Sequence, residues 1–505
     1  MKVLKFGGSS VASSENIKKV INIIIAASKK QKVIVVVSAF GKTTNTLIEG
    51  AHLAQNKNSG YKEIIQKLEK HHFDVIQELI PRQQQSKVVA HIKELFNQLE
   101  TIYKGCYLLE ELSQKTLATI SSFGELLSAA IIAEISNLAL DTNYKDSRDL
   151  IVASEVYLDA VVDFPATNKN ITDYFKDATA LVTLLPGFVA RTNQGQTTTL
   201  GRGGSDYSAA IYAAALDAEE LQIWTDVSGM YTSNPSIVKQ AFAIPHISYH
   251  EAMELSHFGA KVIYPPTIQP VLQKEIPMVI KNTFQPEDIG TRITKDTHTN
   301  NQPVKGISYI ENITLITLGG TGMVGMPGFS KRLFEVLSLH EINITLITQA
   351  SSELSICIGV ENKDADRAQK LIDTIFEYEI HQQKVRPVIL EQDLCIIALV
   401  GDNMKNHQGL SGKMFSSLGK NNVNIRAIAQ GASEKNISAV INKKDAKKAL
   451  NTLHEQFFEE KIKQLNLFVT GVGNVGERFL SQIHQQKEYL KKHLKLSIKV
   501  VGISN

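Results

Sequence analysis

Residues 197–206 read TTTLGRGGSD and stand immediately before an alanine-rich stretch, YSAAIYAAAL. Within this motif three glycines surround Arg202, and Ser205 and Asp206 lie where a helix is expected to begin. Such a turn offers backbone N–H groups to an anion, a guanidinium fork to a carboxylate and an acidic side chain at a helix start. A turn that serves only to reverse the chain has no need of all three. The motif therefore predicts a binding site within an α/β fold.

Glycine-rich or hydroxyl-rich turns also follow the apolar runs that precede this motif. KVLKF is followed by GGSS, and VIVVV is followed by SAFGKTTN, residues 38–45. Helical sequence separates these runs, with one helix expected over 15–29 and mostly helical sequence from about 50 to 120. Continuous apolar strands between helices indicate a mostly parallel sheet covered on both faces, and ligands bind such sheets at the carboxyl ends of the strands. The polar stretch 291–303 predicts a linker, so we place the end of this N-terminal region at 295.

Three further stretches allow two interpretations each. Lys5 before two glycines suits a transferring phosphate, but a plain glycine turn with a surface lysine explains KFGG equally well. SSFGE precedes an apolar helix, and Glu125 in its first turn is by itself more simply explained by the helix dipole. IWTDVSGMYTSNP, residues 223–235, resembles a nucleotide-binding edge, whereas the lysine in FGAKV, Lys261, is a lone charge of the kind usually solvated.

An internal repeat follows the N-terminal region. EINITLITQASSELSICIGV, residues 341–360, aligns with NVNIRAIAQGASEKNISAVI, residues 422–441. Each sequence lies between two helical stretches, so each copy is expected to be an α+β unit of about 80 residues. We place the first repeat copy at 296–390 and the second repeat copy at 391–463.

The C-terminal segment, 464–505, begins with the apolar run LNLFVT and continues with G-x-G-x-x-G, a helical stretch and a second β-rich run. The glycines of the motif are Gly471, Gly473 and Gly476. This pattern is the opening strand–helix–strand of a dinucleotide-binding domain. About forty residues cannot enclose the core of such a domain, so we expect no dehydrogenase activity from this chain.

The composition excludes several classes of function. The chain has 505 residues, of which 43% are hydrophobic. Its net charge of only +3 does not indicate binding to nucleic acid or to a membrane surface. The three cysteines are far apart and form neither a disulfide framework nor a metal site, which fits a reducing compartment. Without a visible signal peptide, we expect a cytoplasmic protein.

Taken together, the motifs of 1–460 resemble aspartate kinase, a member of the amino-acid kinase superfamily. The resemblance rests on KFGGSS, VVSAxGxTTN, FGE, TTTLGRGGSD, TDVxGxYT and FGAKV. It implies a three-layer α/β/α domain that transfers the γ-phosphoryl group of ATP to the β-carboxylate of L-aspartate. Mg²⁺ would be held mainly through the phosphates, with no metal ligand set from the protein.

The resemblance also implies roles for individual residues. The catalytic pair would be Lys5 and Asp206. The residues that hold aspartate would be Ser38, Thr44, Glu125, Arg202 and Ser205. The residues that bind ATP would be Lys5, Gly7, Gly8, Gly203, Gly204, Thr225, Asp226, Tyr231 and Lys261. The family often has an arginine where this chain has Ser236, so we expect weak affinity for ATP.

The repeat resembles paired ACT domains, ferredoxin-like α+β modules that bind amino-acid effectors. The amides that would contact an effector are Asn343, Gln349, Asn424 and Gln430. Pairing of these amides with backbone in a turn remains an alternative. ACT modules usually complete their sheets by pairing across chains, so we expect at least a homodimer.

With GVGNVG at its end, the chain resembles bifunctional aspartokinase–homoserine dehydrogenase, interrupted early in the dehydrogenase domain. NAD(P) would then belong only to a longer parent protein, and the effector would be threonine rather than lysine. Two other hypotheses remain open: an amino-acid-binding regulatory protein with a decayed kinase half, and a kinase of another amino acid.

Overall fold

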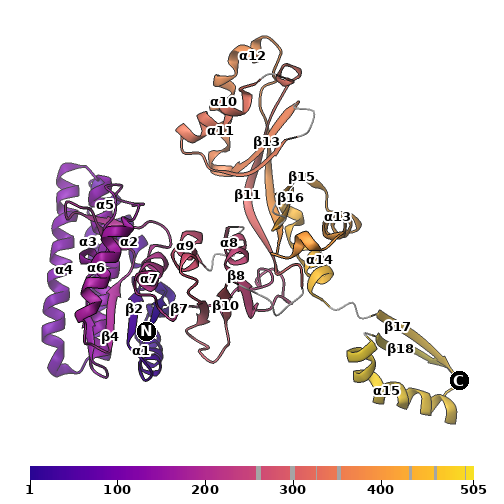
Figure 1. Ribbon diagram of the computed structural model, residues 1–505, viewed down its shortest axis with the longest axis horizontal. Coiled ribbons are helices and arrows are strands. Elements are labelled where there is room, and N and C mark those ends of the chain that lie inside the picture. The colour runs from indigo at the N-terminus through magenta and orange to yellow at the C-terminus, as the bar shows by residue number, and fades with distance from the viewer. Residues whose placement is uncertain are drawn as a thin grey trace.

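An eight-stranded sheet forms the centre of the N-terminal region in the computed structural model (Figure 1), which describes residues 1–257, 263–295, 302–325, 327–349, 354–431, 435–459, 463–494 and 496–504. In spatial order its strands are β3 (Thr142–Tyr144), β4 (Val182–Pro186), β2 (Val33–Val37), β1 (Lys2–Phe6), β7 (Glu220–Thr225), β9 (Met278–Asn282), β10 (Thr291–Thr294) and β8 (His246–Ser248). All neighbours are parallel except β9 and β10. The mostly parallel sheet is confirmed.

Helices cover both faces of this sheet. On one face lie α1 (Ser14–Ser28), α2 (Thr43–Gln55), α3 (Tyr61–Leu79), α4 (Arg82–Leu109) and α5 (Gln114–Asn137); on the other lie α6 (Phe164–Asp177), α7 (Gly204–Ala215), α8 (Tyr249–His257) and α9 (Pro265–Gln273). Successive residues of β1 face opposite layers, since Leu4 and Phe6 belong to the first core and Val3 to the second. The three-layer sandwich is therefore present. A small hairpin, β5 (Val189–Arg191) and β6 (Thr197–Thr199), precedes α7.

Two local expectations are wrong. Glu125 is not in the first turn of a helix, because α5 begins at Gln114 and continues through the SSFGE stretch. The expected linker begins too early, because Thr291–Thr294 forms strand β10 of the main sheet. Helix α5 is also long and apolar enough to cross a membrane, but 83% of its most apolar window is buried inside the fold. It is a core helix.

The two repeat copies share one antiparallel sheet. The first contains β11 (Gly306–Gly319), α10 (Phe329–Leu339), β12 (Ile344–Gln349), β13 (Ser355–Glu361), α11 (Asn362–Ile375) and α12 (Glu377–His381). The second contains β14 (Ile389–Val400), α13 (Leu410–Lys420), β15 (Ile425–Gln430), β16 (Asn436–Asn442) and α14 (Ala446–Phe458). The strand order is β12-β13-β11-β14-β16-β15, with β11 and β14 side by side at the centre.

Each copy borrows the end of a strand from the other. Gly306–Ile310 at the start of β11 pairs with Ile396–Val400, which also pairs with β16. Leu315–Thr317 pairs with Ile389–Glu391 at the start of β14. The boundary that we placed at 390/391 thus falls inside β14. The two copies therefore pair with each other within one chain, and β12 and β15 are the terminal strands of the shared sheet.

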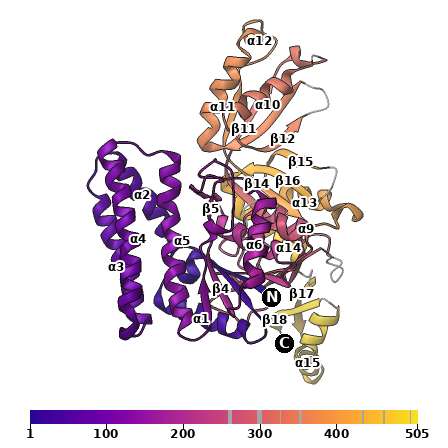
Figure 2. The same cartoon turned by 60° about the vertical axis from the view of Figure 1, so that its left-hand side comes forward.

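Figures 1 and 2 show different surroundings for the three C-terminal units. The first repeat copy projects away from the N-terminal region, whereas the second lies against it. At that contact Asn436 Nδ2 donates to Glu254 Oε2 (2.7 Å), and the Asp402 N–H donates to Glu251 Oε1 (3.0 Å). The C-terminal segment forms a parallel strand–helix–strand unit from β17 (Lys463–Thr470), α15 (Asn474–Leu494) and β18 (Leu496–Ser504), which stands apart from the main sheet in Figure 1.

Candidate active site

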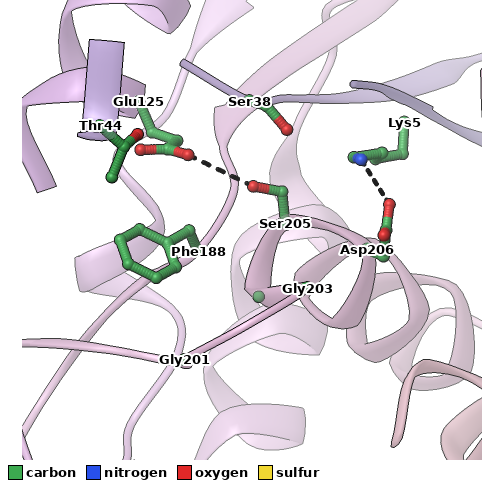
Figure 3. Close-up of a pocket in the computed structure, with 10 residues that line it drawn as sticks. Lys5, Ser38, Thr44, Glu125, Phe188, Gly201, Gly203, Ser205 and Asp206 are labelled. Carbon is green, nitrogen blue, oxygen red and sulfur yellow. Dashed lines mark hydrogen bonds and ion pairs between the residues drawn. The ribbon is translucent and has the colours of Figure 1, made fainter. Parts of the chain in front are cut away.

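A cavity of about 220 Å³ opens at the carboxyl ends of β1 and β2, beside the start of α7 (Figure 3). Its lining residues are Lys5, Ser38, Thr44, Glu125, Phe188, Gly201, Gly203, Gly204, Ser205 and Asp206. They come from segments spread over some two hundred residues of sequence. Most of the polar residues that the motifs singled out for catalysis and for aspartate thus meet in one pocket.

Lys5 and Asp206 form an ion pair at one end of this pocket (Figure 3). Lys5 is the penultimate residue of β1, and Asp206 lies in the first turn of α7. Both side chains are largely withdrawn from solvent, with 9% and 14% of their surface exposed. A largely desolvated lysine and aspartate are retained only where they compensate each other, and the Lys5 ammonium is one of the groups that line the pocket.

Glu125 lies at the opposite wall of the pocket and is fully buried. Ser205 Oγ donates a long hydrogen bond of 3.5 Å to Glu125 Oε1, and Glu125 Oε2 has no partner among the described residues. Burial raises the pKa of Glu125 from 4.5 to about 8, although the Ala39 amide, Lys5 and Ser205 act in the opposite direction. A buried carboxyl with an unused oxygen is suited to receive a cationic group of a ligand.

Two glycines explain how these side chains come together. A Cβ on Gly124 would lie 2.9 Å from Ala39 Cβ and 3.0 Å from Thr44 Oγ1, so glycine lets α5 approach the SAFGKTTN turn. Gly203 has φ +69°, and a Cβ there would lie 2.3 Å from Tyr264 Cβ. Both positions therefore require glycine to keep the pocket wall in place.

One residue of the pocket was missed by sequence analysis, and one predicted residue lies outside it. Phe188 follows β4 with φ 67°, an unusual conformation for a bulky side chain, and its N–H donates to Ser208 Oγ (3.0 Å). Its position two residues after an apolar strand was the available signal. Arg202 lies between two lining glycines, but its side chain is not among those that line the cavity.

The expected nucleotide residues lie along the neighbouring strand ends. Gly7 N–H donates to the Trp224 carbonyl (3.0 Å), which brings the KFGGSS turn beside Thr225 at the end of β7. Thr225 Oγ1 donates to Asp226 Oδ1 (3.1 Å), and Asp226 is exposed. Tyr231 is half-buried in the turn that follows. Gly8 begins a short 3₁₀ turn, Gly8–Val11, and Lys261 lies outside the described residues.

The second repeat copy contains a further cavity, of about 290 Å³, in which Gln430 is a lining residue. Gln430 Oε1 accepts a hydrogen bond of 3.1 Å from Ser411 Oγ, in the first turn of α13. Asn343, Gln349 and Asn424 are exposed and do not line this cavity. Of the four predicted effector amides, only Gln430 therefore lies at a described pocket.

The predicted dinucleotide motif forms the turn between β17 and α15. Gly471 has φ +88°, and a Cβ on Gly476 would lie 2.1 Å from the Gly471 carbonyl oxygen.

In the described part of the chain, no group of three or more His, Cys, Asp or Glu side chains is arranged to hold a metal ion.

Comparison with known proteins identifies the family. Residues 1–282 match the amino acid kinase family, and residues 316–376 and 397–457 each match the ACT domain family. Aspartokinase 1, chloroplastic, of Arabidopsis thaliana is 32% identical over 467 residues, which cover 90% of this chain and 80% of that relative. The chain belongs to the aspartokinases. The bifunctional aspartokinase/homoserine dehydrogenase of Haemophilus influenzae is 37% identical over 512 residues, covering this whole chain and 62% of the relative.

Solved structures of aspartokinases have the same architecture. E. coli aspartokinase III in complex with aspartate and ADP, in its R-state, aligns with a TM-score of 0.77 and 29% identity, covering 91% of this chain and 100% of that one. The same enzyme with lysine and aspartate, in its T-state, aligns with a TM-score of 0.73. The chain spans about 60% of the length of the bifunctional Haemophilus relative, and its similarity runs through the kinase and ACT portions.

Proposed function

We propose that this chain is an active aspartate kinase that transfers the γ-phosphoryl group of ATP to the β-carboxylate of L-aspartate. The observation that carries the proposal is the single pocket that gathers Lys5, Asp206, Glu125, Ser38 and Thr44. The pocket offers a cation near one end and a buried carboxyl at the other. An amino acid with a second carboxylate presents the complementary charges.

Lys5 and Asp206 carry the chemistry in this proposal. An oxygen of the aspartate β-carboxylate attacks the γ-phosphorus of ATP, and the bond from that phosphorus to the bridging oxygen of ADP breaks. The attacking carboxylate is already ionised at neutral pH, so no general base is required. Lys5 neutralises charge that develops on the transferring group, and Asp206 holds the Lys5 ammonium in position through the ion pair.

The other pocket residues hold the substrate. Glu125 pairs with the α-ammonium, while the hydroxyls of Ser38, Thr44 and Ser205 donate to carboxylate oxygens. Arg202 grips the α-carboxylate only if its side chain turns toward the cavity on binding. Such tightening on substrate binding is common for groups at the edge of a ligand-free site.

ATP would bind beside Lys5, along Gly7, Gly8, Gly203, Gly204, Thr225, Asp226, Tyr231 and Lys261. A Cβ on Gly7 would lie 3.7 Å from Lys5 Nζ, so the glycine keeps the space beside the ammonium open for a phosphate. In this proposal Mg²⁺ would be held mainly through the phosphates of ATP. When bound, Mg²⁺ would neutralise phosphate charge.

The ACT pair would make the kinase sensitive to an amino acid, with threonine as the proposed effector and Gln430, Gln349, Asn343 and Asn424 as its contacts. The cavity at Gln430 supports the second-copy site. A homodimer or larger homo-oligomer, a cytoplasmic location and NAD(P) binding in a longer parent protein complete the proposal.

The test is release of ADP with ATP, Mg²⁺ and L-aspartate, with and without threonine. We expect aspartate-dependent turnover that Asp206→Ala abolishes and threonine lowers. Lys2→Ala is the matched control. Lys2 also lies on β1 and is also paired with a carboxylate, that of Glu220, but it is at the other end of the strand. Turnover on another amino acid in preference to aspartate would contradict the proposal. A folded chain that binds threonine without any turnover would favour a regulatory protein instead.

A further inference from the structure

One buried side chain of the last ACT helix reaches the turn that we assign to the nucleotide. His454 of α14 is only 1% exposed, and its Nε2 lies 2.9 Å from Oγ1 of Thr232, the residue after Tyr231. Thr232 Oγ1 also accepts the Phe242 N–H at 3.2 Å. The Thr232 hydroxyl can therefore donate its own proton to Nε2 of a neutral imidazole.

The surroundings of His454 favour that neutral form. Burial lowers the pKa of His454, against the opposite influence of Glu459, whose Oε1 lies 3.9 Å from Nδ1. The imidazole is flanked by Phe458 at 5.1 Å and Phe242 at 6.2 Å between ring centroids. Because the ring is fixed on both sides, its Nε2 has a defined position relative to Thr232.

The backbone of the same turn is tied to the shared ACT sheet. The Thr232 carbonyl accepts the N–H of Ile307, the second residue of β11, at 2.7 Å. Val238, a few residues further along the chain, is fully buried in the hydrophobic core of the second repeat copy, together with Leu450 and Leu453 of α14. The turn is therefore held by the second repeat copy as well as by the main sheet, where the Met230 N–H donates to Thr291 Oγ1 of β10 (2.8 Å).

An ordinary packing role would not require this arrangement. An apolar side chain at 454 would fill the same space between two phenylalanines without burying a polar ring. A hydrogen bond across the contact fixes the Thr232 side chain and hence the backbone that carries Tyr231.

We propose that His454 is a positioning residue for the nucleotide-binding turn, through which the second ACT copy sets the affinity of the kinase for MgATP. The inference rests on the proposed function, since it takes Tyr231 as a nucleotide contact. His454 touches neither substrate, so its effect is expected on ATP and not on aspartate. An effector that shifts α14 would then alter ATP binding before it altered the aspartate pocket.

The experiment compares His454→Leu, Thr232→Val and the double variant in the full chain. Calorimetric Kd values for MgATP and the KM values for both substrates are measured. We expect each single variant to weaken MgATP binding about 5- to 20-fold and to leave the KM for aspartate within about twofold. The double variant should bind MgATP no more weakly than the weaker-binding single variant, because both substitutions remove the same hydrogen bond.

Two controls separate positioning from packing. His454→Gln can place an amide oxygen, which accepts a hydrogen bond as Nε2 does, near the position of Nε2 and should restore MgATP affinity to within about twofold. Lys447→Ala, an exposed change on the same helix, should leave both substrates unaffected. Thr232→Val carries the test by itself if His454→Leu fails to fold.

The inference is overturned if MgATP affinity is unchanged in the folded variants, or if the KM values for ATP and aspartate rise together. It is also overturned if His454→Gln behaves like His454→Leu. A wild-type chain that binds MgATP but shows no aspartate-dependent turnover would sink the proposed function alone, because calorimetry needs no turnover.

Discussion

The aspartate end and the nucleotide end of the proposed site are held in place by different parts of the molecule. At the aspartate end, Lys5, Glu125 and Ser205 come from β1, α5 and α7, which are packed into the three-layer core. At the nucleotide end, Tyr231 lies in a turn whose neighbours Thr232 and Val238 bind to the second ACT copy.

Recognition of the substrate and regulation by an effector are therefore expected to depend on different parts of the molecule. Groups fixed by a close-packed core keep one geometry, which suits selection of a small charged substrate. A turn that is held by the core through Met230 and also by a second module can respond to a movement of that module. An effector is therefore expected to act first on the nucleotide.

The largest effect should come from breaking the ion pair at the aspartate end. Lys5→Ala and Asp206→Ala should each lower kcat by about 10³-fold, because the charge at the transferring group is then unsupported. Steady-state kinetics measures this, with Lys2→Ala as the control. A loss of less than about tenfold in a folded variant would show that the pair is only structural.

Glu125 should give the ligand-free enzyme a distinctive pH dependence of stability. Its pKa in the fold, about 8, lies above the ordinary value of 4.5, so the protonated form favours folding. This contribution is complete below pH 4.5 and is lost as pH rises through 8, a change on the order of 5 kcal/mol.

Chemical denaturation of wild type and Glu125→Gln between about pH 4.5 and 8.5 measures this contribution. The variant should gain stability relative to wild type as pH rises. A constant difference across that range would show that Glu125 is ionised in the free enzyme.

Glu125→Gln should also weaken the binding of aspartate without weakening the binding of ATP. A charged hydrogen bond is worth about 1.5–3 kcal/mol, so Glu125→Gln should raise the KM for aspartate about 10- to 100-fold and leave the KM for ATP unchanged. Binding of aspartate to wild type near pH 7 should also release a proton from Glu125.

Calorimetry in buffers of different ionisation enthalpy detects that release, which the variant should lack. Glu134→Gln, on the same helix but outside the pocket, is the control. An equal rise in the KM for ATP would argue against Glu125 as an ammonium partner.

The smallest effect is expected at the nucleotide end, where an arginine can be restored. Ser236 is exposed, and its N–H and hydroxyl both donate to Asn234 Oδ1. Ser236→Arg keeps the backbone bond and should lower the KM for ATP about 3- to 10-fold through charge-assisted contacts with phosphate.

Gln240→Arg adds the same charge to the same exposed segment and is the matched control. If both substitutions lowered the KM for ATP equally, the gain would reflect general attraction of an anion rather than a site at 236.

More of the residues assigned to aspartate than of those assigned to ATP meet in one pocket, and the order of the strands gives a physical reason for their meeting. Parallel strands bring their carboxyl ends to one edge, so motifs that follow strands can be assigned to one site from the order of strands and helices alone. Glu125 was expected at a helix start because the apolar pattern hides where a buried helix begins. Phe188 had no motif, and the direction of the Arg202 side chain is not encoded by its spacing.

The sequence pattern did not predict that the two ACT copies share one sheet. Each copy has the expected order of strands and helices, but which strand ends pair across the copies depends on tertiary packing. The repeat pattern predicted two units, and the register of β11 against β14 joins them into one.

That register imposes an order on synthesis of the protein. Gly306–Ile310 leaves the ribosome before the rest of the first repeat copy, whereas its partner, Ile396–Val400, leaves after that copy. The early half-strand therefore lacks its partner in β14 until the rest of the first repeat copy has been made. The second copy is made only then, and with it His454, the partner of the Thr232 side chain, so the turn at Thr232 can reach its final form only after the second copy. The nascent chain would acquire its aspartate pocket first and its regulated nucleotide turn last.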